Sequence, residues 1–211
     1  MLSIIQAAGW PIWPLILCSV AALALIFERV SSLRRIRVAP NGLIDEVITV
    51  TGKGVPSADV LGKLASNSTL GELLATGLKA LAADPRCPEP QLREAFEAAG
   101  RTAAHRLERY LNALATIASA APLLGLLGTV IGMIEIFGSQ APGSSGANPA
   151  LLAHGISVAL YNTAFGLIIA IPSLMCYRYF RGRVNEYLHD MERAAERLLQ
   201  HLARLPMRQP K

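Results

Sequence analysis

Polar side chains stand inside the longest charge-free run of the chain, which extends over residues 136–177. The stretch GISVALYNTAFGL, residues 155–167, carries Ser157, Asn162 and Thr163 in an apolar setting. Hydroxyl and amide groups form hydrogen bonds along an ion path, but they do not take up and release protons near neutral pH. Asn162 is costly to expose to lipid and is expected to face protein or water. The run therefore predicts the lining of a proton pathway whose proton carrier lies elsewhere.

A third predicted lining residue, Thr129, stands in the preceding apolar run, on one helix face with Pro122 and Gly125. Around these polar residues, small side chains recur at intervals of four, a spacing that lets membrane helices approach closely. The residues expected to pack helices together are Pro122, Gly125, Gly128, Gly132, Ala159 and Pro172. The packing is either within one subunit, or between copies and around another helix. A threonine hydroxyl in a membrane helix is also commonly bonded back to its own helix.

The other chemistry-bearing residues predict no enzyme and no metal or cofactor site. The cysteines at 18, 87 and 176 lack disulfide or metal spacing. The four histidines, at 105, 154, 189 and 201, have no partner at ligand spacing and form no catalytic set. GLLGT, residues 125–129, bears glycines but lies in an apolar helix and is no phosphate loop. The net charge of +5 comes without the interleaved aromatic residues that nucleic-acid binding uses.

The polar residues must be positioned by helices that cross a membrane. The chain is 52% hydrophobic, and its charges cluster outside three apolar runs. A membrane helix needs about 20 mostly apolar residues, and residues 10–32, 110–138 and 150–180 meet this requirement. Asn148 and Pro149 suit the start of the third helix, as cap and first-turn residue. The fold class is therefore an all-α membrane protein with three transmembrane helices.

Positive charge is concentrated on one predicted side of the membrane. The first positive charge, Arg29, comes after the apolar run of the first span, so this span is expected to be an uncleaved anchor with its N-terminus outside. The positive-inside rule then places residues 1–9 and 139–149 outside, and residues 33–109 and 181–211 in the cytoplasm. The arginines that mark the cytoplasmic side are Arg29, Arg34, Arg35, Arg37, Arg101, Arg106, Arg109, Arg178, Arg181 and Arg183.

The predicted cytoplasmic parts are helical. Short helices are expected over 56–65 and 69–83, followed by a break at 84–90, DPRCPEP. From Gln91 the helical periodicity continues into the second span, which predicts one unbroken helix. A second long helix, over 150–205, would measure about 80 Å. Its apolar stripe consists of Val184, Tyr187, Leu188, Met191, Ala195, Leu198, Leu202 and Leu205. These two stalks are expected to pack on each other or on other copies, and the alternative is a helix on the membrane surface.

Two ordered motifs give a specific family resemblance. APLLGLLGTVIGMIEIF, residues 121–137, and NPALLAHGISVALYNTAFGLIIAIPSLMCYRYFRGRV, residues 148–184, resemble the MotA/TolQ/ExbB proton-channel family, and within it the ExbB/TolQ branch. The match covers the second and third spans, the loop between them and the start of the tail. The N-terminal span fits the family more loosely.

The resemblance implies a multi-pass protein of the bacterial inner membrane, with a periplasmic N-terminus and a cytoplasmic C-terminus. It implies a homo-oligomeric helical bundle, a pentamer, around two copies of a single-span ExbD/TolR-like partner whose membrane aspartate carries the proton. The family's threonines match Thr129 and Thr163. The implied function is that of a proton-channel and motor subunit, which uses the proton gradient to energise transport across the outer membrane through a TonB-like protein.

One position departs from the family pattern, because Val158 stands where many members carry glutamate. Either the partner's aspartate suffices, or this copy conducts differently. Glu135 lies in another span and is interpreted as a residue at the outer rim. The alternatives are a TolQ-like subunit coupled to a TolA-like protein for envelope integrity, and a non-conducting membrane scaffold. A flagellar stator of the MotA type is less favoured, because residues 38–90 lack a strong charged cluster.

Overall fold

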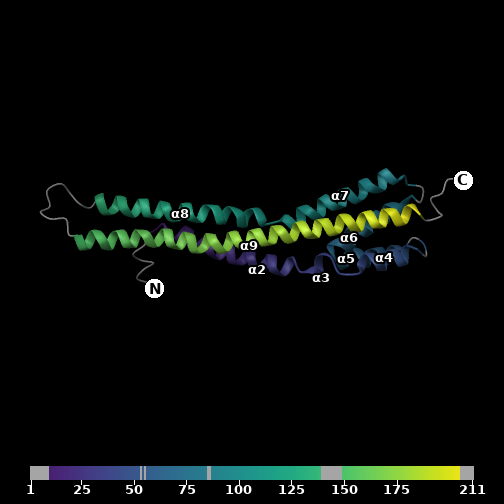
Figure 1. The fold of residues 1–211 in the computed structure, drawn as a ribbon, viewed down its shortest axis with the longest axis horizontal. Helices are drawn as coiled ribbons and strands as arrows, with labels where there is room; N and C mark the ends of the chain where they lie inside the picture. Colours follow the sequence, from purple (N-terminus) through teal and green to yellow (C-terminus); the bar gives the residue numbers. More distant parts are fainter. Residues whose placement is uncertain (1–9, 53, 55, 85–86, 139–148, 205–211) are drawn as a thin grey trace. The chain divides into compact units, whose positions relative to one another are not determined.

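All regular secondary structure in the described residues is helical. The computed structural model describes residues 10–52, 54, 56–84, 87–138 and 149–204. The helices, shown in Figure 1, are α2 (Ile12–Ser32), α3 (Arg35–Val38), α4 (Leu43–Thr51), α5 (Ala58–Asn67), α6 (Thr69–Ala83), α7 (Glu89–Glu108), α8 (Leu111–Gly138) and α9 (Pro149–Ala203). Within these described ranges there is no strand, which confirms the all-α fold class.

Two compact units share the chain. Unit 1 comprises residues 1–28 and 110–179, and unit 2 comprises residues 29–109 and 180–211. Helices α2 and α9 each contribute residues to both units.

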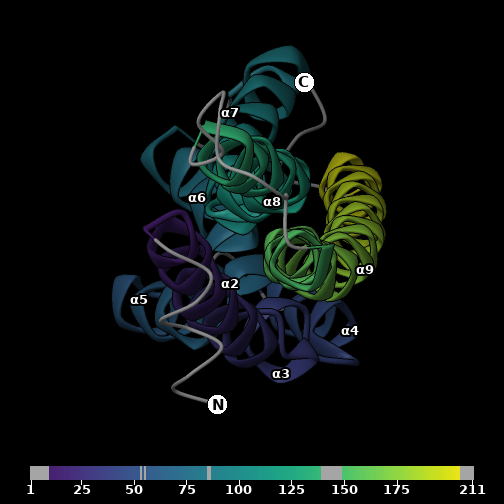
Figure 2. The ribbon, with the colours of Figure 1, turned by 90° about the vertical axis from the view of Figure 1, so that its left-hand side faces the viewer.

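Unit 1 is a three-helix arrangement of α2, α8 and the first half of α9 (Figure 2). Each of the three helices contributes one residue to the core of this unit. These residues, Leu15, Ala121 and Ala170, pack together and are at most 5% exposed. Leu124, Phe165 and Ile169 pack around this cluster. The two alanines leave room for neighbouring helices, so α2 contacts α8 and α9 at one level.

Three helical segments are long and apolar enough to cross a membrane: Ile12–Ser32, Glu89–Gly138 and Gly155–Ala203. In their most apolar windows only 17%, 22% and 28% of the residues are buried, respectively. Large apolar side chains are therefore exposed on all three, among them Phe27 on α2, Leu123 on α8 and Ile168 on α9. Such a surface needs lipid or further protein to cover it. This confirms the prediction of three candidate spans.

Unit 2 is built around α6, whose buried residues include Leu73, Leu74 and Leu78. Ser68 caps this helix, because its hydroxyl accepts a hydrogen bond from the Gly71 amide at 3.0 Å. Helices α5 and α7 both pack on α6. Within this unit the predicted helices 56–65 and 69–83 correspond to α5 and α6, and the predicted break separates α6 from α7.

Helix α9 runs without interruption for 55 residues, which corresponds to about 80 Å at the usual rise per residue. The predicted stripe on its second half is largely buried inside unit 2: Val184, Tyr187, Met191, Leu198 and Leu202 are at most 2% exposed. An ion pair between Arg93 and Glu196, 3.1 Å, joins α7 to this half of α9. The stripe thus packs on protein within the unit, as expected of a stalk.

The predicted unbroken helix from Gln91 through the second span is wrong. Helix α7 ends at Glu108, and α8 begins at Leu111. Arg109 has an extended backbone (φ −50°, ψ 138°), and Tyr110 has a φ of 64°, in the left-handed region. Leucine, glutamate, arginine and tyrosine are all tolerated in helices, so this interruption leaves no local sequence signal.

A buried arginine stabilises the end of α7. Arg29 is 2% exposed, and its Nη1 donates to the carbonyl oxygen of Leu107 at 3.0 Å. The last four carbonyls of a helix have no partner within that helix. The Arg29 guanidinium therefore donates to the Leu107 carbonyl oxygen, which would accept a hydrogen bond from a backbone amide further along the chain if the helix continued.

We expect Arg29→Met to lower the free energy of unfolding by about 1.5–3 kcal/mol, the usual contribution of a hydrogen bond to a charged group. The check is thermal unfolding of the purified chain in neutral detergent. Arg34→Met serves as control, since Arg34 belongs to the same arginine-rich region but is exposed. Equal losses in the two variants would contradict the capping role of Arg29.

Several predictions fall outside the described residues. These are the external N-terminus over 1–9, the loop over 139–148 with the Asn148 cap, and the end of the stripe at Leu205.

Candidate functional site

Glycines let α8 and α9 approach to backbone contact inside unit 1. A Cβ added to Gly125 would lie 2.7 Å from the Asn162 carbonyl oxygen and 2.9 Å from the Thr163 Cα. One added to Gly166 would lie 2.6 Å from the Ala121 carbonyl oxygen. Real Cβ atoms do not approach backbone atoms this closely, so only glycine fits at both positions. The predicted close packing is therefore present within a single chain.

The same contact continues towards the end of α8. A Cβ added to Gly132 would lie 3.0 Å from the Ala159 Cβ, and Ala159 is 3% exposed. A Cβ on Gly155 would lie 2.6 Å from the Ile136 side chain. Figure 2 shows α8 and the first half of α9 side by side along this seam. The small residues at 125, 132 and 159 therefore make contacts within one chain.

Asn162 lies in this seam rather than on the outer surface of the chain. It is 2% exposed, and its carboxamide covers Gly128, where an added Cβ would lie 2.9 Å from Nδ2. The expectation that Asn162 faces protein is met. Its carboxamide lies against α8 of its own chain, which is the position of a packing residue.

The two threonines differ in how their hydroxyls are used. Thr129 donates to the carbonyl oxygen of Leu126 at 2.7 Å, the common bond back to the same helix. Ser157 and Ser173 on α9 do likewise, to Ala153 at 2.9 Å and Ile169 at 2.7 Å. Among the serines and threonines in the described parts of α8 and α9, only Thr163 has a hydroxyl without a hydrogen-bond partner among the described residues.

Thr163 is half-buried, and its backbone rests against Gly125. The glycine contact therefore positions Thr163 within the seam, while the hydroxyl remains available to water or to another chain. Such a group can both donate and accept a hydrogen bond. These properties suit a residue that lines a path for protons but does not store one.

The remaining predicted residues take different positions. Pro122 is half-buried in α8, whereas Pro172 is exposed in α9. Val158 is half-buried, and Glu135 is exposed near the end of α8. No group of three or more His, Cys, Asp or Glu residues that could hold a metal was found among the described residues.

The burial of Ser173 and of Arg29 was not predicted from the sequence. Ser173 is 1% exposed and lies on the α9 face that also bears Asn162 and Gly166. Ser173 follows Ile169 by four residues and Gly166 by seven, and this helical spacing was the signal in the sequence that could have placed it on the same face. Arg29 resembled a topology-setting charge, and nothing in its local sequence distinguished it from its exposed neighbours.

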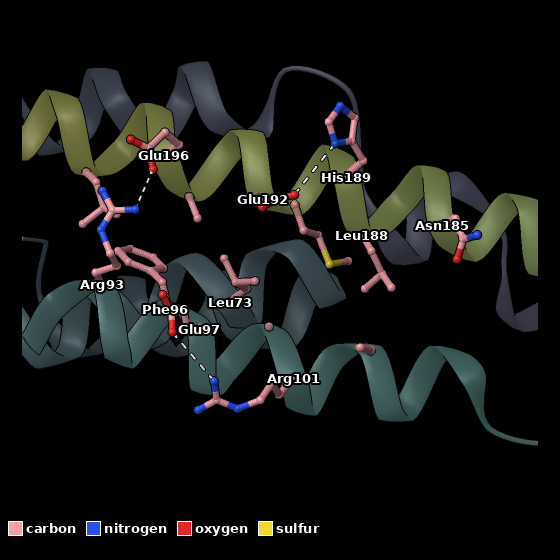
Figure 3. A pocket seen from close by; sticks show the side chains of 15 residues that line it. Leu73, Arg93, Phe96, Glu97, Arg101, Asn185, Leu188, His189, Glu192 and Glu196 are labelled. Atoms are coloured by element: carbon pink, nitrogen blue, oxygen red, sulfur yellow. Dashed lines mark hydrogen bonds and ion pairs between the residues drawn. The ribbon is translucent and has the colours of Figure 1, made fainter. Parts of the chain in front are cut away.

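Unit 2 carries a groove between α7 and the second half of α9, about 610 Å³ in volume (Figure 3). Leu73, Phe96 and Leu188 form part of its apolar floor. Ion pairs lie along its rim, including Arg93 with Glu196. The hydrogen bond from Arg93 to Glu196, together with the carboxylate charge, raises the pKa of Arg93 above its ordinary value. The Arg93 side chain on this rim is thus charged at all physiological pH values.

The described residues form an all-helical structure with three helices that are apolar enough to cross a membrane, two of them joined by glycine contacts, which defines a multi-pass membrane protein. The profile of the MotA/TolQ/ExbB proton channel family matches residues 65–193. The chain belongs to this family, in its ExbB/TolQ branch.

Relatives from both halves of this branch are similar over most of the chain. An ExbB-like biopolymer transport protein of Synechocystis is 35% identical over 178 residues, which cover 84% of this chain and 83% of that protein. The biopolymer transport protein exbB1 of Vibrio cholerae is 34% identical, over 80% of this chain and 74% of its own length. The Tol-Pal system protein TolQ of Pseudomonas aeruginosa is 31% identical, over 80% and 76% respectively. The predicted family is confirmed, and the similarities do not separate ExbB-like from TolQ-like roles.

Proposed function

We propose that this chain is the proton-channel subunit of an inner-membrane motor that energises transport across the outer membrane through a TonB-like protein. Five copies would surround two copies of a single-span partner of the ExbD/TolR type. The partner's membrane aspartate would bind and release the proton, and Thr129 and Thr163 would line its path.

The observation that carries the proposal is the available hydroxyl of Thr163. It stands on a backbone held against Gly125, in a membrane helix whose other described serine hydroxyls are bonded to their own helix. Membership of a proton channel family supplies the context in which such a group is useful. The exposed apolar surface of the three spans supports assembly with other helices.

Acidic residues suited to carrying the proton are scarce in the described parts of α8 and α9 that span the membrane. Glu135 is the acid of α8, and it is exposed near the helix end. Val158 occupies the family's frequent glutamate position and cannot titrate. These facts favour a carrier supplied by a second chain.

The topology proposed for the chain places residues 1–9 and 139–149 in the periplasm, and residues 33–109 and 181–211 in the cytoplasm. It rests on the one-sided distribution of arginine and lysine. A tag at residue 1 that is labelled only from the cytoplasm would contradict it.

A TolQ-like role, coupled to a TolA-like protein, is the second candidate, because the TolQ protein of Pseudomonas aeruginosa is similar over 80% of this chain, the same share as exbB1 of Vibrio cholerae. A non-conducting scaffold is the third, favoured by Val158. The chain is to be purified from mild detergent together with a co-expressed candidate partner, and its companions identified by mass spectrometry. A co-purified single-span protein with a membrane aspartate supports the channel, whereas a homo-oligomer alone supports the scaffold.

Proton flux then separates a conductor from a scaffold. The complex is reconstituted into vesicles loaded with a pH-sensitive dye, and a potential is applied. We expect flux with the wild-type partner and none when the partner's aspartate is changed to asparagine. Equal flux in both preparations would contradict a carrier on the partner.

A further inference from the structure

The segment that follows α2 is fixed at both ends. Leu33, Val38 and Ala39 are at most 7% exposed, within unit 2. The Tyr187 hydroxyl on α9 donates to the Leu33 carbonyl oxygen at 2.9 Å. The Arg34 carbonyl oxygen accepts hydrogen bonds from two amides of the short helix α3, which closes the segment into a tight turn.

Between these anchors, four consecutive side chains are exposed: Arg34, Arg35, Ile36 and Arg37. Ile36 is 81% exposed, more than Phe27 at 72% on the apolar helix that precedes it. Because the Ile36 side chain is so exposed, although its segment is anchored, it buries little apolar surface in the folded chain. The four residues together present three positive charges around one apolar side chain, two residues beyond the end of α2.

The other arginines near the ends of the spans mostly serve the protein itself. Arg29 donates to Leu107, and Arg181 pairs with Glu108 at 3.0 Å. Arg183 bonds Glu186 at 2.6 Å and the Tyr187 hydroxyl at 2.8 Å. Their charges are therefore satisfied within the chain.

The exposed cluster differs from this group. Among the described residues, neither Arg34 nor Arg37 has an ion-pair partner, and Arg35 reaches Asp190 only at 3.9 Å. Arg178 is exposed as well, but it stands between two tyrosines without a second arginine beside it. A topology signal requires only positive charge, and any of these arginines would supply it. Topology alone does not explain why the arginines are clustered, why their segment is anchored, or why Ile36 is exposed among them. These features therefore indicate a further function.

We propose that residues 34–37 form a binding site for anionic phospholipid headgroups at the membrane surface next to α2. The guanidinium groups of Arg34 and Arg37 bind the lipid phosphates, because guanidinium presents two parallel donors to such a group. Ile36 enters the boundary between headgroups and acyl chains. The site is independent of proton conduction and requires only that α2 crosses the membrane.

The test measures lipid binding to the purified full-length chain in neutral detergent, by native mass spectrometry. Phosphatidylglycerol, phosphatidylcholine and inorganic phosphate are titrated separately. The variant is the double substitution Arg34→Gln and Arg37→Gln. Its matched control is Lys79→Gln with Arg204→Gln, which removes the same charge from two exposed side chains that have no ion pair among the described residues.

The wild-type chain is expected to bind phosphatidylglycerol more tightly than phosphatidylcholine. The arginine variant should weaken phosphatidylglycerol binding about 30-fold, since each basic residue near an anionic surface contributes about fivefold. The charge-matched control should stay within about twofold of wild type. Ile36→Ser should weaken both lipids about tenfold, because it removes the same apolar contact from each.

Unchanged affinity for phosphatidylglycerol in the arginine variant would overturn the proposal, and so would an equal loss in the control. Displacement of phosphatidylglycerol by millimolar inorganic phosphate would show a site for free phosphate instead of a lipid surface. An unfolded variant is recognised by its thermal transition. Single Arg34→Gln and Arg37→Gln variants, each expected to lose about fivefold, then decide the question.

Discussion

Replacing Thr163 with valine is expected to lower proton flux through the assembled complex about tenfold or more while the assembly stays intact. Valine has nearly the same shape and replaces the hydroxyl with a methyl group, and this hydroxyl has no hydrogen-bond partner among the described residues. An unmet hydrogen bond at a water-poor site costs roughly 1–3 kcal/mol, enough to slow transfer about tenfold or more. Flux into dye-loaded vesicles and oligomer size by chromatography are the two measurements.

Thr163→Ser is the matched control, because it keeps a hydroxyl at the same position. It should retain most of the flux. Thr129→Val should also reduce flux, but less than Thr163→Val, since the Thr129 hydroxyl already donates to Leu126. Full flux in Thr163→Val, with normal assembly, would remove Thr163 from the pathway.

Replacing Gly125 with alanine is expected to destabilise the chain by about 1–3 kcal/mol, the usual cost of overpacking. The new Cβ would meet the Asn162 carbonyl oxygen at 2.7 Å and the Thr163 Cα at 2.9 Å. Both are backbone atoms of a long helix and cannot rotate away as a flexible side chain would. The measurement is the thermal transition in detergent, together with proton flux, because the same shift displaces Thr163.

Gly182→Ala provides the control within α9. No atom lies within 4 Å of a Cβ placed on Gly182, and the residue is exposed. Alanine there should be neutral or stabilising by up to about 1 kcal/mol, from its helix propensity. If both substitutions had the same effect, the close contact at Gly125 would not be what holds α8 against α9.

Local patterns determined a large part of this protein from the sequence alone. Apolar runs of sufficient length specified the three spans, and the stripe on the tail specified the buried face of α9. Both depend only on hydrophobicity and on the helical repeat, which every residue carries with it. The family followed from the ordered motifs around Gly125 and Gly155.

The tertiary structure decided how those elements are used, because that depends on contacts between distant residues. The glycines pack α8 on α9 of the same chain. Among the described serines and threonines of these two helices, Thr163 alone keeps its hydroxyl available, and its spacing in the sequence does not distinguish it from Thr129. The interruption at Tyr110 accompanies a bond between Arg29 and Leu107, 78 residues apart. The helix propensity of a segment depends on residues that are near one another in the sequence, so it does not include a partner as distant as Arg29. For this reason the sequence pattern predicted a continuous helix.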